Sequence, residues 1–180
     1  NVSTYSGSPS SGFVNGSLSN ARYNYPYGIA FDGNSSIYVA DLNNNVIRKV
    51  DIVTNLVSTY AGTGVAGYQD GPSSVAQFNG PSGVFCYNGN VYVADNLNNR
   101  IRMIDVSGNV TTIAGNGVAG FADGAPSTAQ FYQPKSLYVS SNGDIYVADY
   151  ENHRIRKISA GQVSTYAGTG VAGFQNGSAS

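Results

Sequence analysis

The apolar positions fall into short runs that are too closely spaced for helices. Runs rich in Val, Ile, Tyr and Thr lie at Gly28 to Asp32, Ser36 to Asp41, Val46 to Asp51 and Leu56 to Gly62. Short turn sequences, "GNS", "LNNN" and "IVTN", separate them. Such gaps are typical of antiparallel hairpins. No segment keeps a 3.6-residue apolar period, so the pattern predicts an all-β chain with almost no helix.

This four-run pattern occurs three times. The sequence "YVAD" ends at Asp41, Asp95 and Asp149, and "PYGIAFD", "PSGVFCY" and "PKSLYVS" begin at Pro26, Pro81 and Pro134. A further element, "VSTYSG" or a close variant, begins four times, at Val2, Val57, Val110 and Val163. The sequence therefore predicts one repeat region over 1–180, with repeats at 1–55, 56–109 and 110–162 and a partial fourth at 163–180.

Between repeats lies a long Gly-rich connection, such as Thr63 to Pro81. A four-stranded meander followed by one long crossover is the unit of a β-propeller blade. The first strand of each blade is then innermost and the fourth outermost. Within the connection we expect a helical turn that plugs an aromatic residue between blades, at Ala21 to Tyr23, Ala76 to Phe78 and Ala129 to Phe131.

The unit resembles the NHL repeat, whose signature reads Pro-x-Gly-Ile-Ala, a Tyr-Val-Ala-Asp strand and Asn-x-Arg-Ile. "YVADYENHRIRKI" carries the match down to "NHRI" at Asn152 to Ile155, and the resemblance covers nearly the whole chain. Two places depart from it: Asn45 and Val46 replace the usual Asn and Arg, and "PKSLYVS" lacks the glycine after its proline. The resemblance implies a propeller that closes with six blades. Three blades are then half of a ring or a segment of a longer array.

The ends of the repeat leave surfaces without a neighbour. The sequence contains four outermost strands for three inner sets, which leaves Val2 to Tyr5 or Val163 to Tyr166 free to pair elsewhere. Uncovered strand edges favour association. We expect exposed apolar faces built from Ile37, Val39, Val91, Val93, Ile145 and Val147. The chain is therefore expected in a multi-chain ring, a longer propeller or a repeating assembly, and never as a lone monomer.

Composition excludes several functional classes. Charged residues make up 11% of the chain and the formal net charge is −1. A chain with 9 Lys and Arg lacks the clustered cations that bind nucleic acid or anionic lipid. No apolar run approaches the roughly 20 residues that span a bilayer. Cys86 and His153 are the single cysteine and histidine, so the sequence predicts no internal disulfide, no metal site and no cofactor.

Candidate site residues each have a structural interpretation. Asp41, Asp95 and Asp149 are expected to accept turn N–H groups and to pair with Arg48, Arg102 and Arg156. "DLNNN" at Asp41 to Asn45 resembles a calcium loop, but the required glycine and terminal glutamate are missing. His153 replaces the turn residues Asn45 and Asn99, and Cys86 is expected to be a buried small hydrophobe. No catalytic residue is assigned.

Five Asn-x-Ser/Thr sequons are candidates for N-glycosylation: Asn1, Asn15, Asn34, Asn109 and Asn176. Their number is close to that expected by chance, but their positions in turns and connections are accessible. They favour an extracellular, secreted or cell-surface location.

The repeated, weakly charged, Tyr- and Asn-rich surface favours one function first. We expect a non-enzymatic extracellular scaffold or adhesion module that contacts itself, other proteins or glycans. Two alternatives stay open: a ligand-binding propeller completed by oligomerisation or a longer chain, and a lyase or hydrolase at the propeller axis. The amidating lyases among NHL proteins use a zinc site with several histidines, which this sequence lacks.

Overall fold

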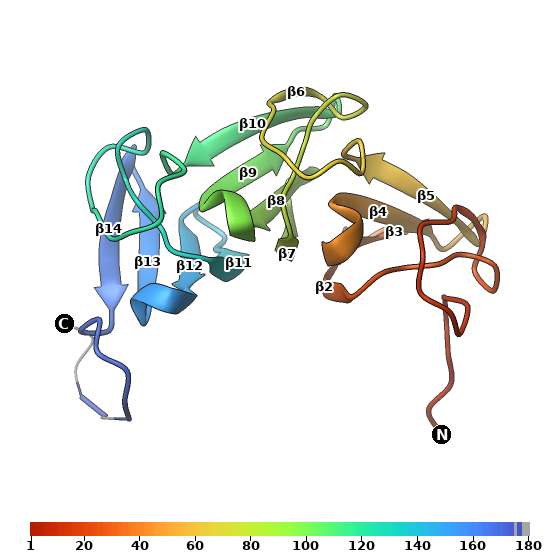
Figure 1. Ribbon diagram of the computed structural model, residues 1–180, viewed down its shortest axis with the longest axis horizontal. Helices are drawn as coiled ribbons and strands as arrows, with labels where there is room; N and C mark the ends of the chain where they lie inside the picture. Colours follow the sequence, from red (N-terminus) through yellow and green to blue (C-terminus); the bar gives the residue numbers. More distant parts are fainter. Residues whose placement is uncertain (175, 178–180) are drawn as a thin grey trace.

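The chain folds into three antiparallel sheets that stand side by side in an arc (Figure 1). We describe a computed structural model, in which all residues except 175 and 178–180 are placed. The three sheets are three blades, here called A, B and C in chain order. This architecture confirms the all-β propeller predicted from the sequence. Among the described residues, no helix is long and apolar enough to span a membrane.

Each blade is a meander in which the chain moves outward from the arc's inner edge (Figure 1). In blades A and B a two-residue strand from the connection adds to the outer edge. Blade A contains β1 (Gly16–Ser17), β2 (Pro26–Phe31), β3 (Ser36–Asp41), β4 (Val46–Asp51) and β5 (Leu56–Ala61). Blade B contains β6 (Gly71–Pro72), β7 (Pro81–Tyr87), β8 (Asn90–Asp95), β9 (Arg100–Ile104) and β10 (Asn109–Ala114). Blade C contains β11 (Pro134–Val139), β12 (Ile145–Asp149), β13 (Arg154–Ser159) and β14 (Gln162–Ala167).

A single 3-10 turn joins the second and third strands of every blade. The turns are η1 (Leu42–Asn44), η2 (Asn96–Asn98) and η3 (Tyr150–Asn152). Each ends on a left-handed residue, Asn45, Asn99 or His153, with φ of 54°, 52° and 51°. Asn tolerates this conformation better than most residues, so the sequence pattern explains where the second hairpin reverses.

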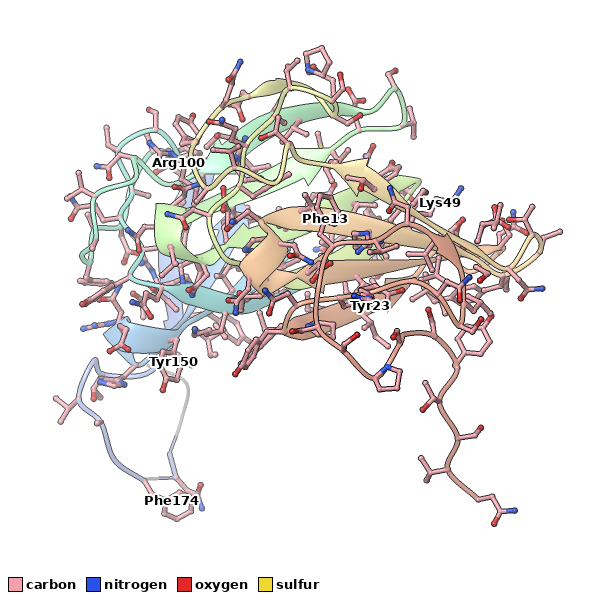
Figure 2. All side chains as sticks on the ribbon, turned by 45° about the vertical axis from the view of Figure 1, so that its right-hand side comes forward. Phe13, Tyr23, Lys49, Arg100, Tyr150 and Phe174 are labelled. Carbon is pink, nitrogen blue, oxygen red and sulfur yellow. The ribbon has the colours of Figure 1, made fainter. Side chains whose placement is uncertain are left out.

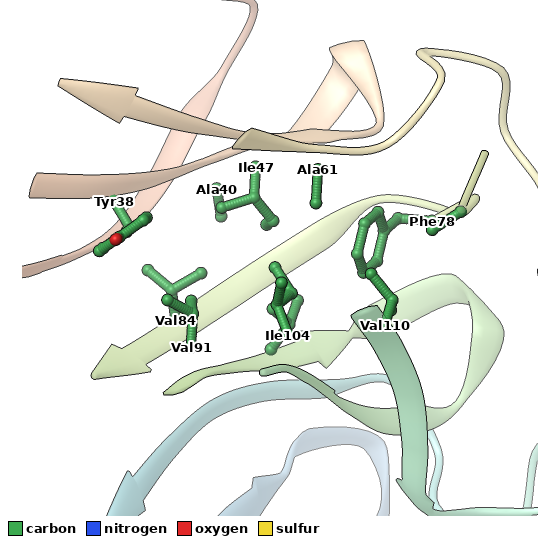
Figure 3. Packing of buried hydrophobic residues seen from close by; sticks show 11 residues of the cluster. Tyr38, Ala40, Ile47, Ala61, Phe78, Val84, Val91, Ile104 and Val110 are labelled. Carbon is green, nitrogen blue, oxygen red and sulfur yellow. The ribbon is translucent and has the colours of Figure 1, made fainter. Parts of the chain in front are cut away.

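The core lies between the blades. Tyr38, Ala40, Ile47 and Ala61 of blade A face Val84 and other apolar residues of blade B (Figure 3). An equivalent layer joins blades B and C around Ala94, Ile101, Leu137, Val147 and Ile158. Because side chains alternate across a strand, each blade has one face for the preceding blade and one for the following blade.

The aromatic residues of the connections lie between blades as expected, but the backbone that leads to them is not helical. Phe78 and Phe131 are fully buried between neighbouring blades, whereas Tyr23 is half-buried on blade A. The expected helical turn is wrong, because Gln77 and Gln130 form isolated antiparallel bridges with Gln69 and Ala122. Each connection therefore forms a bridge with itself, and the residue after the bridge is the buried Phe78 or Phe131.

Two further expectations about the ends need correction. Val2 to Tyr5 is not a strand, although its sequence matches that of β5 and β14, because no neighbouring strand lies beside it. In blade C, Ile145 and Val147 are buried against blade B. The uncovered side of that sheet is apolar as expected, but it carries Ile155 and Tyr166 instead.

Candidate functional site

The innermost strands bring three equivalent positions to one end of the sheets. Tyr27, Ser82 and Lys135 each follow the proline that begins β2, β7 and β11. These strands lie close together: the Ser82 hydroxyl donates to the Lys135 carbonyl oxygen at 2.9 Å. A methyl group at Gly28 would collide with the Ser82 carbonyl oxygen. The 3-10 turns start beside the same strand ends, since the Asp149 N-terminal to η3 pairs with Pro134.

Four side chains meet there, and we call them the inner mouth: Tyr27, Asn96, Lys135 and Tyr150. The Lys135 ammonium lies 6.0 Å from the Tyr27 ring centre and 5.5 Å from that of Tyr150. It donates to the Asn96 Oδ1 at 3.5 Å. The Asn96 amide nitrogen in turn donates to the Pro134 carbonyl oxygen at 3.1 Å, which fixes its orientation.

Lys135 is the lysine without a carboxylate neighbour among the residues that the structure describes. Lys49 pairs with Asp51 at 3.8 Å and Lys157 with Asp144 at 2.7 Å, but among the described residues no carboxylate lies within ion-pair distance of Lys135. Tyr27 and Tyr150 are 59% and 56% exposed, and Figure 2 shows Tyr150 on the η3 turn. The inner mouth therefore offers a cation, an ordered amide and two accessible aromatic rings to a molecule from solution.

The aspartates that recur in each repeat lie away from the inner mouth and already have hydrogen-bond and ion-pair partners. Asp41, Asp95 and Asp149 are fully buried, and each pairs with the arginine seven positions later at 2.9, 2.7 and 2.8 Å. Each also accepts one backbone N–H and one Asn side-chain amide, as Asp95 does from Asn79 and Asn98. These carboxylates stabilise the blade and are inaccessible to a ligand.

The remaining predicted candidates are scattered. His153 is exposed at the end of η3, and Cys86 is half-buried beside Asp32 and Tyr38. Burial raises the pKa of the Cys86 thiol to about 12, so its reactive thiolate form is rare near neutral pH. No group of three or more His, Cys, Asp or Glu side chains that could hold a metal occurs among the described residues. The Asp41 carboxylate of "DLNNN" is occupied by Arg48 and Asn44.

The sequons differ in their surroundings. Asn1, Asn15, Asn34 and Asn176 are exposed, and Asn109 is half-buried at the start of β10. The Asn15 Oδ1 accepts from Arg48 at 2.8 Å. Ser178, which completes the Asn176 sequon, lies outside the described residues.

Sequence reasoning missed the inner mouth. Its members come from two strands and two turns, β2 of blade A, η2 of blade B, and β11 and η3 of blade C, so no local motif joins them. One signal was present: "PKSLYVS" departs from the repeat and places a lysine where the other units carry Tyr27 and Ser82.

Comparisons with known proteins agree with the fold. The family model "NHL repeat" matches residues 131–158. The chain is 36% identical over 131 residues to the Arabidopsis thaliana protein "SUPPRESSOR OF QUENCHING 1, chloroplastic", covering 67% of this chain and 12% of that protein. It is 46% identical over 61 residues to "NHL repeat-containing protein 2" of Gallus gallus, covering 34% and 8%. The chain thus spans a small part of both relatives.

Other similar proteins are enzymes or binding proteins. A Caenorhabditis elegans protein named as a peptidyl-alpha-hydroxyglycine alpha-amidating lyase is 31% identical over 139 residues, which cover 76% of this chain and 37% of the lyase. Among solved structures, an auxiliary nutrient binding protein from Bacteroides ovatus superposes with a TM-score of 0.68 at 24% identity, covering 82% and 39%. Virginiamycin B lyase from Staphylococcus aureus gives 0.55 at 14% identity, covering 83% and 43%.

These similarities correct the expectation of a non-enzymatic protein. That expectation relied on the repeated, weakly charged surface and on the single histidine, whereas a relative with 31% identity is named as an amidating lyase. The NHL resemblance is confirmed by the family match, the NHL-containing relatives and the propeller fold. The chain therefore belongs to the NHL-repeat family.

Proposed function

We propose that this chain forms part of a ligand-binding NHL propeller and that the inner mouth holds a small carboxylated molecule. The observation that carries the proposal is the Lys135 ammonium, which lies near two exposed tyrosine rings and has no carboxylate partner in the described part of the chain. A cation of this kind forms charge-assisted hydrogen bonds with a carboxylate. The rings of Tyr27 and Tyr150 supply apolar faces for the body of the ligand, and their hydroxyls supply polar contacts.

One relative supports this ligand class: the Caenorhabditis elegans protein is named for a peptidyl-alpha-hydroxyglycine, which carries a carboxylate. Sugar acids and acyl-glycines combine a carboxylate with a flat or ring-shaped body, as the inner mouth requires. Both therefore serve as probes.

The test is calorimetric titration of the chain with glucuronate and N-benzoylglycine. Glucose and N-benzoylglycinamide are the matched uncharged probes. We expect the acids to bind and the neutral probes to bind far more weakly. Lys135→Met should weaken binding of the acids by about tenfold or more, because a hydrogen bond to a charged group contributes about 1.5–3 kcal/mol.

Lys49→Met is the control variant, because Lys49 lies on β4 beside Asp51 and away from the inner mouth. Equal binding of charged and neutral probes, equal effects of the two lysine substitutions, or no binding of either acid would each refute the proposal.

A second candidate is lyase chemistry at the same mouth, and the 31% identity to the amidating lyase favours it. A positioned ammonium stabilises negative charge that develops on an oxygen in a transition state. Following N-benzoyl-alpha-hydroxyglycine by NMR over time separates the two candidates, because a binding protein returns it unchanged, whereas a lyase of the amidating kind breaks its C–N bond to give benzamide and glyoxylate.

An extracellular location and an adhesion role are separate proposals, which do not depend on the inner mouth. Adhesion to proteins or glycans would use the blade surfaces and would be unaffected by Lys135→Met. The exposed sequons Asn15 and Asn34 support a secretory route. Peptide mass mapping of native material tests it: unmodified masses for the peptides that contain the two sites count against glycosylation.

A further inference from the structure

The two ends of the arc present faces that match the faces buried inside it. On blade C, Tyr146, Ala148, Ile155 and Ala167 form what we call the trailing face. Ile155 is 38% exposed, whereas the equivalent Ile47 and Ile101 are fully buried against the following blade. In this region a concavity of about 280 Å³ is lined by Ala148, Tyr150, His153, Ile155 and Ala167, among others.

On blade A, Ile29, Phe31 and Ile37 form the corresponding leading face. Ile29 is 70% exposed, whereas the equivalent Val84 and Leu137 are each 7% exposed against the preceding blade. Register identifies the equivalence, since Ile29, Val84 and Leu137 pair with Val39, Val93 and Val147. Each end of the arc therefore lacks the partner that the other end could supply.

A hydrogen bond marks each internal joint, and both halves of it recur at the open ends. Asn45 Oδ1 accepts the Gly80 N–H of blade B at 3.0 Å, and Asn99 Oδ1 accepts the Gln133 N–H of blade C at 3.0 Å. The equivalent acceptor position on blade C is His153, and the equivalent donor on blade A is the Tyr25 N–H.

Both end groups already have the geometry of the internal joints. His153 has φ 51° and ψ 42°, against 52° and 42° for Asn99. Tyr25 has φ 56°, against 58° for Gly80 and 50° for Gln133. The described residues supply no hydrogen-bond acceptor for the Tyr25 N–H. A neutral imidazole has one acceptor nitrogen, so His153 can take the role that Asn45 and Asn99 have.

We propose that the trailing face of blade C binds the leading face of blade A in a second copy of this chain. Two such contacts, related by a two-fold axis along the propeller axis, close a six-bladed ring of two chains, the blade number that the NHL family implies. The contact is heterologous, and heterologous contacts form a closed ring when the rotation per subunit closes. The occupant is argued from continuity: the same contact is made twice inside each chain.

One residue makes this joint weaker than the internal ones. A Cβ atom at Gly83 would lie 2.8 Å from the Lys135 carbonyl oxygen, and one at Gly28 would collide with the Ser82 carbonyl oxygen. The equivalent position on blade C is Ser136, which has a Cβ and is exposed. The inner strands at the new joint therefore lie farther apart, and Ser136→Gly should tighten the contact.

The test is sedimentation equilibrium of the full chain across a wide dilution series, without ligand. We expect a reversible equilibrium between 18.8 kDa and twice that mass. The double variant Ser136→Gly with His153→Asn should associate about tenfold more tightly, because it restores the glycine and the amide acceptor of the internal joints. Ligand binding at the inner mouth is measured in a separate experiment. Failure of the dimer proposal therefore leaves the ligand-binding proposal untouched, and the reverse also holds.

Loss-of-contact variants test the geometry. Ile155→Glu or Ile29→Glu alone should abolish the dimer, while Val106→Glu, an exposed turn residue, should not. An equimolar mixture of the Ile155→Glu and Ile29→Glu chains should recover a weaker dimer, because one intact contact remains. Circular dichroism confirms that each variant is folded.

A folded monomer at every concentration would overturn the proposal, as would a dimer insensitive to Ile155→Glu. Open-ended growth of the mass with concentration would exclude the closed ring, and absence of recovery in the mixture would exclude a heterologous contact.

Discussion

At the residue scale, the three buried arginines differ in one partner. Arg102 Nε donates to Asp70 at 3.0 Å and Arg156 Nε donates to Asp123 at 3.1 Å. In blade A the equivalent partner is Asn15, whose Oδ1 accepts from an Arg48 terminal nitrogen at 2.8 Å. Arg48 Nε is left as a buried donor without a partner among the described residues. A buried unpaired donor costs free energy, so blade A carries a defect that the other blades lack.

We predict that Asn15→Asp raises the free energy of unfolding by about 1 kcal/mol, because a carboxylate at this position pairs with Arg48 and accepts a hydrogen bond from its Nε. This figure allows for solvent screening, which weakens the ion pair because position 15 is exposed. Urea denaturation of unglycosylated protein measures it. Asp70→Asn is the reciprocal variant in blade B and should lower the same quantity. An unchanged or lower stability for Asn15→Asp would show that Arg48 Nε is not a defect.

At the scale of elements, the close approach of the innermost strands decides where the side chains of the inner mouth lie. Gly83 has no side chain to separate β7 from β11, and the Ser82 hydroxyl therefore reaches the carbonyl oxygens of both Pro134 and Lys135. This approach fixes the backbone of Lys135. Asn96, held by the Pro134 carbonyl oxygen, then lies within reach of the Lys135 ammonium.

Gly83→Ala should therefore lower the free energy of unfolding by about 1–3 kcal/mol, as overpacking of a filled site does, and should weaken ligand binding at the inner mouth as well. Thermal melting and the titration with glucuronate measure the two effects. Gly173→Ala is the matched control, because a Cβ there meets nothing within 4 Å and the backbone is not in the left-handed region. Equal melting temperatures for the two variants would contradict the close approach.

At the scale of the whole molecule, stability comes from layers between blades, and the A–B layer contains groups that ionise in alkali. Burial raises the pKa of Tyr60, and it raises the pKa of Tyr38 further. Burial also raises the pKa of Cys86 to about 12. All three groups are neutral when protonated, and the folded layer favours that neutral form.

The sign of the pH dependence follows. Because the folded pKa values lie above the unfolded ones, the contribution to stability is complete below the unfolded pKa values, about 8.5 for Cys and 10 for Tyr. It is lost as the pH rises toward the folded values. We predict a melting temperature that is level near neutral pH and falls steeply above about pH 9. Tyr38→Phe should flatten that fall, whereas the exposed Tyr5→Phe should not; identical alkaline profiles would contradict the assignment.

The sequence alone determined the features that repeat. Hydrophobic alternation and turn residues fixed the meander of each blade, and the Asn residues of "LNNN" and "NLNN" marked the 3-10 turns, because these depend on neighbours within a few residues. Asp41 and Arg48 are seven residues apart and lie on the two paired strands of one hairpin. Their ion pair could therefore be predicted without knowledge of the other blades.

Only the tertiary structure decided what happens between repeats. Val2 to Tyr5 and Val163 to Tyr166 are nearly the same sequence, yet only the second is a strand, because β13 lies beside it. Strand formation depends on a partner more than on intrinsic preference. Tyr27, Asn96, Lys135 and Tyr150 are far apart in sequence and meet because three sheets turn their first strands toward one edge. Contacts of this kind depend on packing between blades, which no single repeat specifies.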